Sequence, residues 1–383
     1  MAILTPKFVA LDSATLNKIA ADHFSGEERL RTKAQSLVRQ LAGGDVYITL
    51  TFTHLCELFS HKDRSKVDDR IRWLRGLPFI AWVRPYDGSW FPGGMTDIIL
   101  RELHAIVHDG AIDWATVIGN VQPTLLETGV GSEMFVDRPE LWELISQIGR
   151  RLEKNQQYIA SVARAEDSDV GKTKLKHIMP IPPAPQTEAS KNRQLEKLAE
   201  GIESKLVKHG DERLPPKAAA DAFVNDPSLD IAKVDAIGGE LGQAIMDFFG
   251  VPKELVSQKM TVEQVVELAT HAKQLEIACK KLRPPASRKL TDIPPGSIPS
   301  FTIQRALTLE QNKADHVSGS DLGDQSLIPL AFYLDALEVD KRTHDHVRKI
   351  RQRDAKIAAH LRHVFRSPDY SSIPATLAKL GVI

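Results

Sequence analysis

Cysteine is almost absent from this chain, which contains only Cys56 and Cys279 among its 383 residues. Two cysteines cannot build a disulfide framework, and they cannot form a zinc site made of cysteines alone. This excludes the small disulfide-stabilised domains and the four-cysteine zinc modules. The scarcity of cysteine predicts a reducing, cytoplasmic location.

Long apolar runs are missing as well. No window approaches the roughly 20 consecutive apolar residues that a membrane-spanning helix needs. The beginning of the chain, MAILTPKFVALD, lacks the basic region and the apolar run of a signal peptide. We therefore expect no membrane partner.

An excess of charge of either sign is the third absence. Lys plus Arg and Asp plus Glu both number 50, so net charge does not indicate a nucleic-acid partner, and contacts to one must come from local basic clusters. The length of 383 residues and the apolar fraction of 42% predict two cores, or one core with a large insertion.

The first ninety-odd residues carry a strand–helix pattern. Phe8–Leu11 is a short apolar run that ends at Asp12, residues 46–51 are β-branched and aromatic, and residues 78–83 form a third apolar run. Helical stretches lie between them, and the second begins near Thr53. Strands that alternate with helices predict an α/β fold with a parallel sheet.

The middle of the chain, residues 96–300, has a different pattern of amphipathic helices and proline-rich joints such as residues 180–185. Apolar stripes predict helices near 195–206 and 241–249, and Thr261 with Gln264 predicts a capping box for another helix. We interpret this segment as a mostly α-helical insertion that follows a first core part, residues 1–95.

The α/β pattern returns in residues 301–383, the second core part. A helix is expected to begin near Ser326 or Leu327, because Pro329 fits only the first turn. Residues 336–339 predict a short strand that ends at Asp340, and a basic helix follows.

Five acidic residues are expected to converge on one edge of the sheet. Asp12 and Asp340 follow strands, Asp321 and Asp324 precede a helix, and Glu57 lies one turn into another helix. Ligands of open α/β sheets bind at the carboxyl ends of the strands. Clustered carboxylates repel one another, and Mg²⁺, which prefers oxygen ligands, removes that repulsion and promotes phosphodiester hydrolysis. The cluster therefore predicts Mg²⁺ or Mn²⁺ as cofactor.

These blocks, in this order, resemble the PIN-domain ribonuclease family. FVALDSATLNKIA is similar to the family's opening strand with its first metal-binding acid, at Asp12, and ITLTFTHLCEL resembles the second strand and the helix that supplies Glu57. SGSDLGDQSLIPLAFYLDALEVDKRT is the best match, with Asp324 where the third family acid opens a helix and Asp321 as an accessory ligand. Asp340 stands where the family often has Thr or Ser followed by Asn and Asp, so it is either a ligand or a supporting group.

The resemblance covers the segments 1–95 and 301–383 and implies a PIN-like parallel sheet flanked by helices, which the helical segment interrupts. It implies a Mg²⁺- or Mn²⁺-dependent endonuclease that cuts RNA, with DNA as the alternative substrate. The implied catalytic residues are Asp12, Glu57, Asp324 and Asp340. Toxin, RNA-processing and defence roles all fit the family, and the oligomeric state stays open.

Two basic stretches lie next in sequence to these acids. Arg64 and Arg70 follow the helix of Glu57, and Lys341, Arg342 and Arg348 follow Asp340. Residues in these places are suited to phosphate contacts, so we predict that they bind the nucleic acid. A basic run is more often a solvated helix face, which is the competing interpretation.

Three alternatives remain open at this point. An aspartate at a strand end is often only a helix cap or turn residue. His54, Glu57 and His61 share one helical face and suit zinc, although their spacing is not that of the HExxH motif. Finally, the chain could be a non-enzymatic interaction protein, in which a PIN-like core is a scaffold and the helical segment binds a protein partner.

Overall fold

The computed structural model separates the chain into two compact units. Unit 1 comprises Met1–Lys154, Gly296–Lys313 and Ser320–Ile383, and unit 2 comprises Asn155–Pro295 and Ala314–Gly319. The residues that the structure describes are 5–165 except 90, 136 and 137, isolated positions between 196 and 221, 260–284, and 293–383 except 295, 312 and 314–318.

Unit 1 is built around a six-stranded sheet of order β4-β3-β2-β1-β5-β6. The strands are β1 (Lys7–Ala10), β2 (Val46–Leu50), β3 (Ile80–Val83), β4 (Leu126–Gly129), β5 (Ala336–Glu338) and β6 (His363–Phe365). All neighbouring strands are parallel except β3 and β4. The predicted α/β class with a parallel sheet is confirmed, and the strands expected near residues 8, 46 and 80 are all present.

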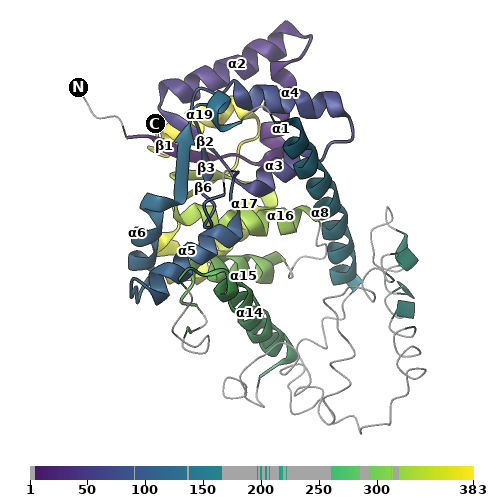
Figure 1. Cartoon of the computed structure of the whole chain (residues 1–383), viewed down its shortest axis with the longest axis vertical. Coiled ribbons are helices and arrows are strands. Elements are labelled where there is room, and N and C mark those ends of the chain that lie inside the picture. The colour runs from purple at the N-terminus through teal and green to yellow at the C-terminus, as the bar shows by residue number, and fades with distance from the viewer. Residues whose placement is uncertain are drawn as a thin grey trace. The chain divides into compact units, whose positions relative to one another are not determined.

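Helices cover both faces of this sheet (Figure 1). The first part of unit 1 contains α1 (Ser13–His23), α2 (Glu28–Gly43), α3 (Phe52–Phe59), α4 (Arg64–Arg75), α5 (Met95–Val107), α6 (Trp114–Leu125), α7 (Gly131–Met134) and the start of α8 (Pro139–Ala165). The later part contains α15 (Pro299–Gln311), α16 (Gly319–Leu327), the 3₁₀ helix η4 (Ile328–Phe332), α17 (Lys341–Arg353), α18 (Ala355–His360), the 3₁₀ turn η5 (Tyr370–Ser372) and α19 (Ile373–Lys379). Helices α1, α2, α4 and α19 pack together on one side, and α5, α6, α15 and α17 lie on the other.

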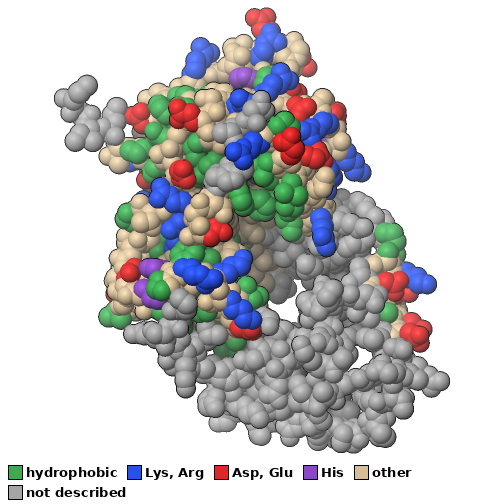
Figure 2. All heavy atoms as spheres, in the orientation of Figure 1, with side chains coloured by type: hydrophobic (Ala, Val, Ile, Leu, Met, Phe, Trp, Pro, Cys, Tyr) green, Lys and Arg blue, Asp and Glu red, His purple; other side chains and the backbone are tan. Residues whose placement is uncertain are grey.

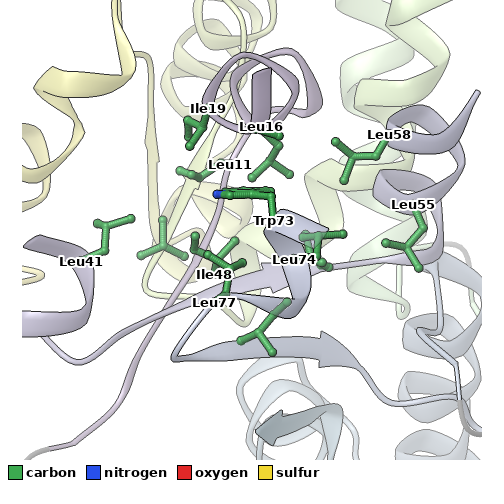
Figure 3. Close-up of a cluster of buried hydrophobic side chains, with 14 of the residues drawn as sticks. Leu11, Leu16, Ile19, Leu41, Ile48, Leu55, Leu58, Trp73, Leu74 and Leu77 are labelled. Atoms are coloured by element: carbon green, nitrogen blue, oxygen red, sulfur yellow. The ribbon is translucent and has the colours of Figure 1, made fainter. Parts of the chain in front are cut away.

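Trp73 of α4 lies at the centre of the core on the first face, with only 2% of its surface exposed. Apolar side chains from α1, α2, α3, β2, α4 itself and the residues that follow β1 and α4 surround it (Figure 3). The labelled ones are Leu11, Leu16, Ile19, Leu41, Ile48, Leu55, Leu58, Leu74 and Leu77. Burying each such side chain stabilises the fold by about 2 kcal/mol. This packing fixes the end of β1 and the helix α3 relative to each other.

Residues 96–154 belong with the sheet, whereas the sequence pattern placed them in the helical segment. Strand β4 pairs antiparallel with β3, from Ile80 opposite Gly129 to Val83 opposite Leu126. Helices α5 and α6 contribute buried residues such as Leu103 and Val117 to unit 1. The sequence pattern did not indicate β4, because Leu126-Glu127-Thr128-Gly129 has no apolar run and contains only one β-branched residue, Thr128.

In unit 2 the structure describes α14 (Val262–Lys281), and its predicted capping box is confirmed. The backbone N–H of Thr261 donates to Oε1 of Gln264 at 2.9 Å, and Gln264 N–H donates to Oγ1 of Thr261 at 3.3 Å. The proline-rich residues 180–185 and the helix expected over 241–249 lie outside the described residues, as does most of the helix expected over 195–206.

The helix expected to begin near Ser326 or Leu327 is η4, a 3₁₀ helix with Leu327 as its N-cap. The expectation that Asp321 and Asp324 precede a helix was wrong, because both lie within α16. Helix α16 already begins at Gly319, and η4 takes over at Ile328 with Pro329 in its first turn. Proline has no N–H to donate, so the first turn of η4 accommodates it without losing a hydrogen bond. Within the described residues, no helix is long and apolar enough to cross a membrane.

Candidate acidic site at the sheet edge

The strand order changes direction at β1, which lies between β2 on one side and β5 on the other. Chain segments leaving β1 and β5 therefore diverge at the carboxyl end of these strands, which is where open α/β sheets bind ligands. Asp12 lies two residues beyond β1, Glu338 is the last residue of β5, and Asp340 follows it. Acids from the two ends of the chain thus meet at one place.

Asp12 is held by both of its neighbouring elements. Its Oδ1 accepts a hydrogen bond from the N–H of Ala14 at 3.1 Å and so caps α1, while its own N–H donates to Oε2 of Glu338 at 3.3 Å. Burial raises the pKa of Asp12, the Ala14 N–H opposes this, and the charge of Asp340 raises the pKa further. The cap and the acidic site therefore use the same side chain.

Glu57 approaches the site from α3. Burial raises the pKa of its carboxyl group, the Ser13 hydroxyl opposes this effect, and the charges of Asp12 and Glu153 add to it. A Cβ atom placed on Gly323 would lie 2.8 Å from Oε1 of Glu57, so this carboxylate lies directly against α16. Glu57 consequently lies beside the residue that precedes Asp324.

Asp324 and Asp340 are linked through Thr343, which is fully buried. The Thr343 hydroxyl donates to Oδ2 of Asp324, and the Thr343 N–H donates to Oδ1 of Asp340 at 2.7 Å, which makes Asp340 the N-cap of α17. The backbone of Asp321 lies in α16, but its side chain is outside the described residues.

Glu338 is the acid that the sequence pattern did not indicate. It is 3% exposed, and burial raises its pKa to about 7; the charge of Asp12 also raises it, against hydrogen bonds from Thr15 and the Asp12 N–H. The available signal was a carboxylate inside the apolar run Ala336-Leu337-Glu338-Val339, since a buried strand holds an acid only when it has a partner. We refer to Asp12, Glu57, Asp324, Glu338 and Asp340 as the acidic cluster.

The donors of the acidic cluster are all carboxylate oxygens, which suit a hard divalent cation. No three His, Cys, Asp or Glu side chains among the described residues are arranged so that they could hold a metal ion. Instead, the carboxylates are linked in pairs: Asp12 with Glu338 through the Asp12 N–H, and Asp324 with Asp340 through Thr343. Magnesium is commonly held by one or two carboxylates, with water and substrate phosphate completing its shell, so pairs are compatible with it.

The histidines of α3 have other roles than binding zinc. Nδ1 of His54 accepts from the Thr51 N–H at 3.0 Å, and Nε2 lies 3.1 Å from the carbonyl oxygen of Leu11. Burial lowers the pKa of His54 to about 4, so the ring is neutral and Nε2 donates its proton to Leu11. His61 Nδ1 accepts from the Asp63 N–H at 2.9 Å. With both rings engaged by the backbone, the zinc alternative has no support.

His54 also corrects the expected start of α3. The helix begins at Phe52 with Thr51 as its N-cap, rather than at Thr53, and the His54 ring closes the capping box. Because the same ring binds Leu11, the residue before Asp12, it ties the start of α3 to the end of β1. His54 therefore positions both Asp12 and Glu57.

The residues that were predicted to contact nucleic acid differ in their exposure and in the groups with which they pair. Arg70 donates to the carbonyl oxygen of Leu58 and burial lowers its pKa, so it closes the end of α3. Arg64 pairs with Asp68 and Glu143. On α17, Lys341 is exposed, Arg342 is half-buried, and the side chain of Arg348 is 62% exposed with Asp345 at 3.8 Å.

Figure 2 shows one face of the molecule, on which the Lys and Arg side chains of the described part are interspersed with Asp and Glu. This face carries no continuous basic surface over the described residues, in keeping with the equal numbers of acidic and basic residues. On this face, nucleic acid would therefore be bound at discrete sites.

Comparison with protein-family models, with curated proteins and with solved structures finds no match to this chain. Function is therefore inferred from the geometry and chemistry of the site itself.

Proposed function

We propose that this chain is a Mg²⁺- or Mn²⁺-dependent endonuclease with a PIN-like core, and that its substrate is RNA. The observation that carries the proposal is the meeting of carboxylates from the two ends of the sequence at the switch point of a parallel sheet. Burial raises the pKa of Asp12, Glu57 and Glu338, so ionising them together is costly. A divalent cation bound among them would lower that cost.

Asp12, Glu57 and Asp324, which come from three different elements, are the proposed ligands. No three such side chains of the described residues are arranged around one point, so an ion would be held by one or two of these carboxylates, with water and substrate phosphate completing its shell. When bound, such an ion lowers the pKa of water and stabilises the charge on a leaving oxygen. Glu338 positions Asp12 by accepting its backbone N–H. Asp340 fixes Thr343, whose hydroxyl holds one oxygen of Asp324.

Substrate phosphates would be bound by Lys341 and Arg348, which are exposed on the helix that Asp340 caps. The phosphate backbone supplies most of the affinity for such a strand, so this contact favours nucleic acids over other phosphoesters. We propose RNA as the substrate because the three motif blocks resemble those of PIN-domain ribonucleases. DNA offers the same phosphates and is the alternative substrate.

Cleavage of a labelled RNA in Mg²⁺ tests this proposal with three variants. Asp12→Asn and Asp324→Asn are expected to lower the cleavage rate by about a hundredfold or more. Mutation of even a supporting group of a metal site lowers metal affinity or activity roughly ten- to a hundredfold. Asp109→Asn removes an exposed carboxylate outside the cluster and is expected to cleave as the wild type does. Equal cleavage by all three variants would show that the acidic cluster is not the catalytic site.

The second candidate is a non-catalytic interaction protein. Its support is that Asp12 caps α1, that Asp340 caps α17, and that one oxygen of Asp324 is occupied by Thr343. In that case the chain retains a PIN-like core as a scaffold and residues 155–295 bind a protein partner. A wild-type chain that binds no Mn²⁺ and cleaves neither RNA nor DNA would favour this candidate.

A further inference from the structure

A cleft of about 550 Å³ lies between the start of α4 and the first half of α8. Basic and polar side chains dominate its walls, which consist of His61, Lys62, Arg64, Val67, Glu143, Ser146 and Arg150. Lys62, Arg64 and Arg150 carry three positive charges there, against the single negative charge of Glu143. The cleft is therefore positive although the whole chain is neutral.

The two arginines of the cleft share one carboxylate. Arg64 pairs with Glu143 and with Asp68, and Arg150 Nη2 lies 3.3 Å from Oε1 of Glu143. Arg150 also donates from Nη1 to the Ser146 hydroxyl at 2.7 Å. Glu143 thus holds both guanidinium groups in place, and Asp68 supplies a second negative charge to Arg64. Hydrogen bonding from Gln147, together with Arg150 and Arg64, lowers the pKa of Glu143, so its carboxylate is fully ionised at neutral pH.

The cleft and the acidic cluster are held at a fixed spacing by the contact of α8 with α3. The Ser146 hydroxyl donates to the carbonyl oxygen of Phe59 at 2.6 Å, and Gly149 brings the two backbones so close that an added Cβ would lie 2.2 Å from the Cys56 carbonyl oxygen. On the same helical face, Glu153 acts electrostatically on Glu57. Arg150 and Glu153 are three residues apart on α8, a rise of about 4.5 Å along the helix axis.

We propose that this cleft binds a phosphodiester group of the substrate strand next to the one that is cut, with Lys62, Arg64 and Arg150 as the phosphate contacts. This inference rests on the proposed nuclease function. A phosphate accepts several charge-assisted hydrogen bonds, and two guanidinium groups held by one carboxylate present their remaining donors to it without first having to be ordered. By holding this phosphate, the cleft would determine which phosphodiester of the nucleic-acid strand lies at the acidic cluster.

The test measures binding and cleavage separately on the full-length chain. Binding of a fluorescent single-stranded RNA is measured by anisotropy in EDTA, so that cleavage does not interfere. Arg150→Gln and Lys62→Gln are each expected to weaken binding by roughly five- to tenfold and to reduce the salt dependence of the dissociation constant. Arg72→Gln is the matched control, because Arg72 lies on α4 outside the cleft and pairs with Asp69; it is expected to change binding less than twofold.

A second variant, which is expected to strengthen RNA binding, distinguishes the loss of a phosphate contact from misfolding. Asp68→Asn removes an exposed carboxylate that pairs with Arg64 from outside the lining of the cleft, and it is expected to tighten RNA binding by about threefold, which a destabilised protein would not do. In Mg²⁺, Arg150→Gln is expected to raise KM for the longer strand with little change in kcat, and to leave cleavage of a dinucleotide unaltered, since a dinucleotide does not reach the cleft.

The outcomes separate this inference from the nuclease proposal. RNA binding by Arg150→Gln equal to that of Arg72→Gln would overturn the cleft assignment, even if the wild type cleaves RNA. Equal loss of dinucleotide and long-strand cleavage would also overturn it. Binding that depends on the cleft in a chain that does not cleave would support the cleft and contradict the nuclease function.

Discussion

Among the described residues, burial raises the pKa of two carboxyl groups, those of Glu102 and Glu338, to about 7. Glu338 belongs to the acidic cluster, whereas Glu102 lies on α5 and supports the fold. Its Oε1 accepts from the Ser300 hydroxyl at 2.7 Å and from the Tyr333 hydroxyl at 2.6 Å, and its Oε2 accepts from the Ser300 N–H at 3.1 Å. At the residue scale, a raised pKa therefore shows that a carboxyl group is buried. It indicates a functional site only where acids from separate elements lie close together.

Glu102 gives a test of pH-dependent stability. Its pKa in the folded chain, about 7, is above the ordinary value of 4.5, so its favourable contribution is complete below pH 4.5 and is lost as the pH rises through about 7. Glu102→Gln resembles the protonated form. We expect the variant to match the wild type at low pH and to be more stable at pH 8, by at most about 3 kcal/mol. Urea unfolding at several pH values measures this difference, and parallel stability curves for the two proteins would contradict the assigned pKa.

At the scale of elements, α8 packs closely against α3. Gly149 lies against the Cys56 backbone, and Phe59 meets Trp142 edge to face, with their ring centroids 5.9 Å apart. Because α3 carries Glu57 and α8 carries Arg150, this contact determines how the acidic cluster and the cleft are spaced.

Gly149→Ala is expected to destabilise the chain by about 1–3 kcal/mol, since the added methyl group would meet a backbone carbonyl oxygen. Gly119→Ala in α6 is the matched control, because a Cβ there has no heavy atom within 4 Å and alanine favours helix by up to about 1 kcal/mol. Chemical unfolding of both variants provides the comparison. A neutral or stabilising Gly149→Ala would contradict the close packing of α8 on α3.

The sequence predicted those elements whose apolar pattern is continuous. Strands β1, β2 and β3 and the α14 capping box were found in this way, as was the position of Asp12 at a strand end. Strand β4 was missed because its pairing with β3, rather than its own residues, stabilises it. The start of α16 was missed because Gly319-Ser320-Asp321 has low helix propensity.

Residue roles that depend on tertiary contacts were equally hidden from the sequence. The capping of α3 by Thr51 and His54 depends on the place of Leu11, some forty residues earlier in the chain. Arg70 was expected to bind phosphate, and nothing in its local sequence indicates that it contacts the Leu58 carbonyl instead. The partnership of Glu338 with Asp12 likewise exists only once β5 lies beside β1.

At the scale of the whole molecule, the two ends of the sequence build one sheet. Strand β1 pairs with β2 along Lys7–Val9 and with β5 along Val9–Ala10, so the amino-terminal and carboxyl-terminal parts become neighbours in the centre. The acidic cluster forms only where these parts meet. This arrangement is the physical basis for the proposed cation site.

The most direct test of the central claim is calorimetric titration of the chain with Mn²⁺ at pH 8. We expect saturable binding that Asp12→Asn and Asp324→Asn abolish or weaken at least tenfold, while Asp109→Asn leaves it unchanged. Binding should weaken as the pH falls below 7, because protons compete for carboxylates whose pKa is raised. No saturable binding by the wild type, or equal binding by all three variants, would contradict the account.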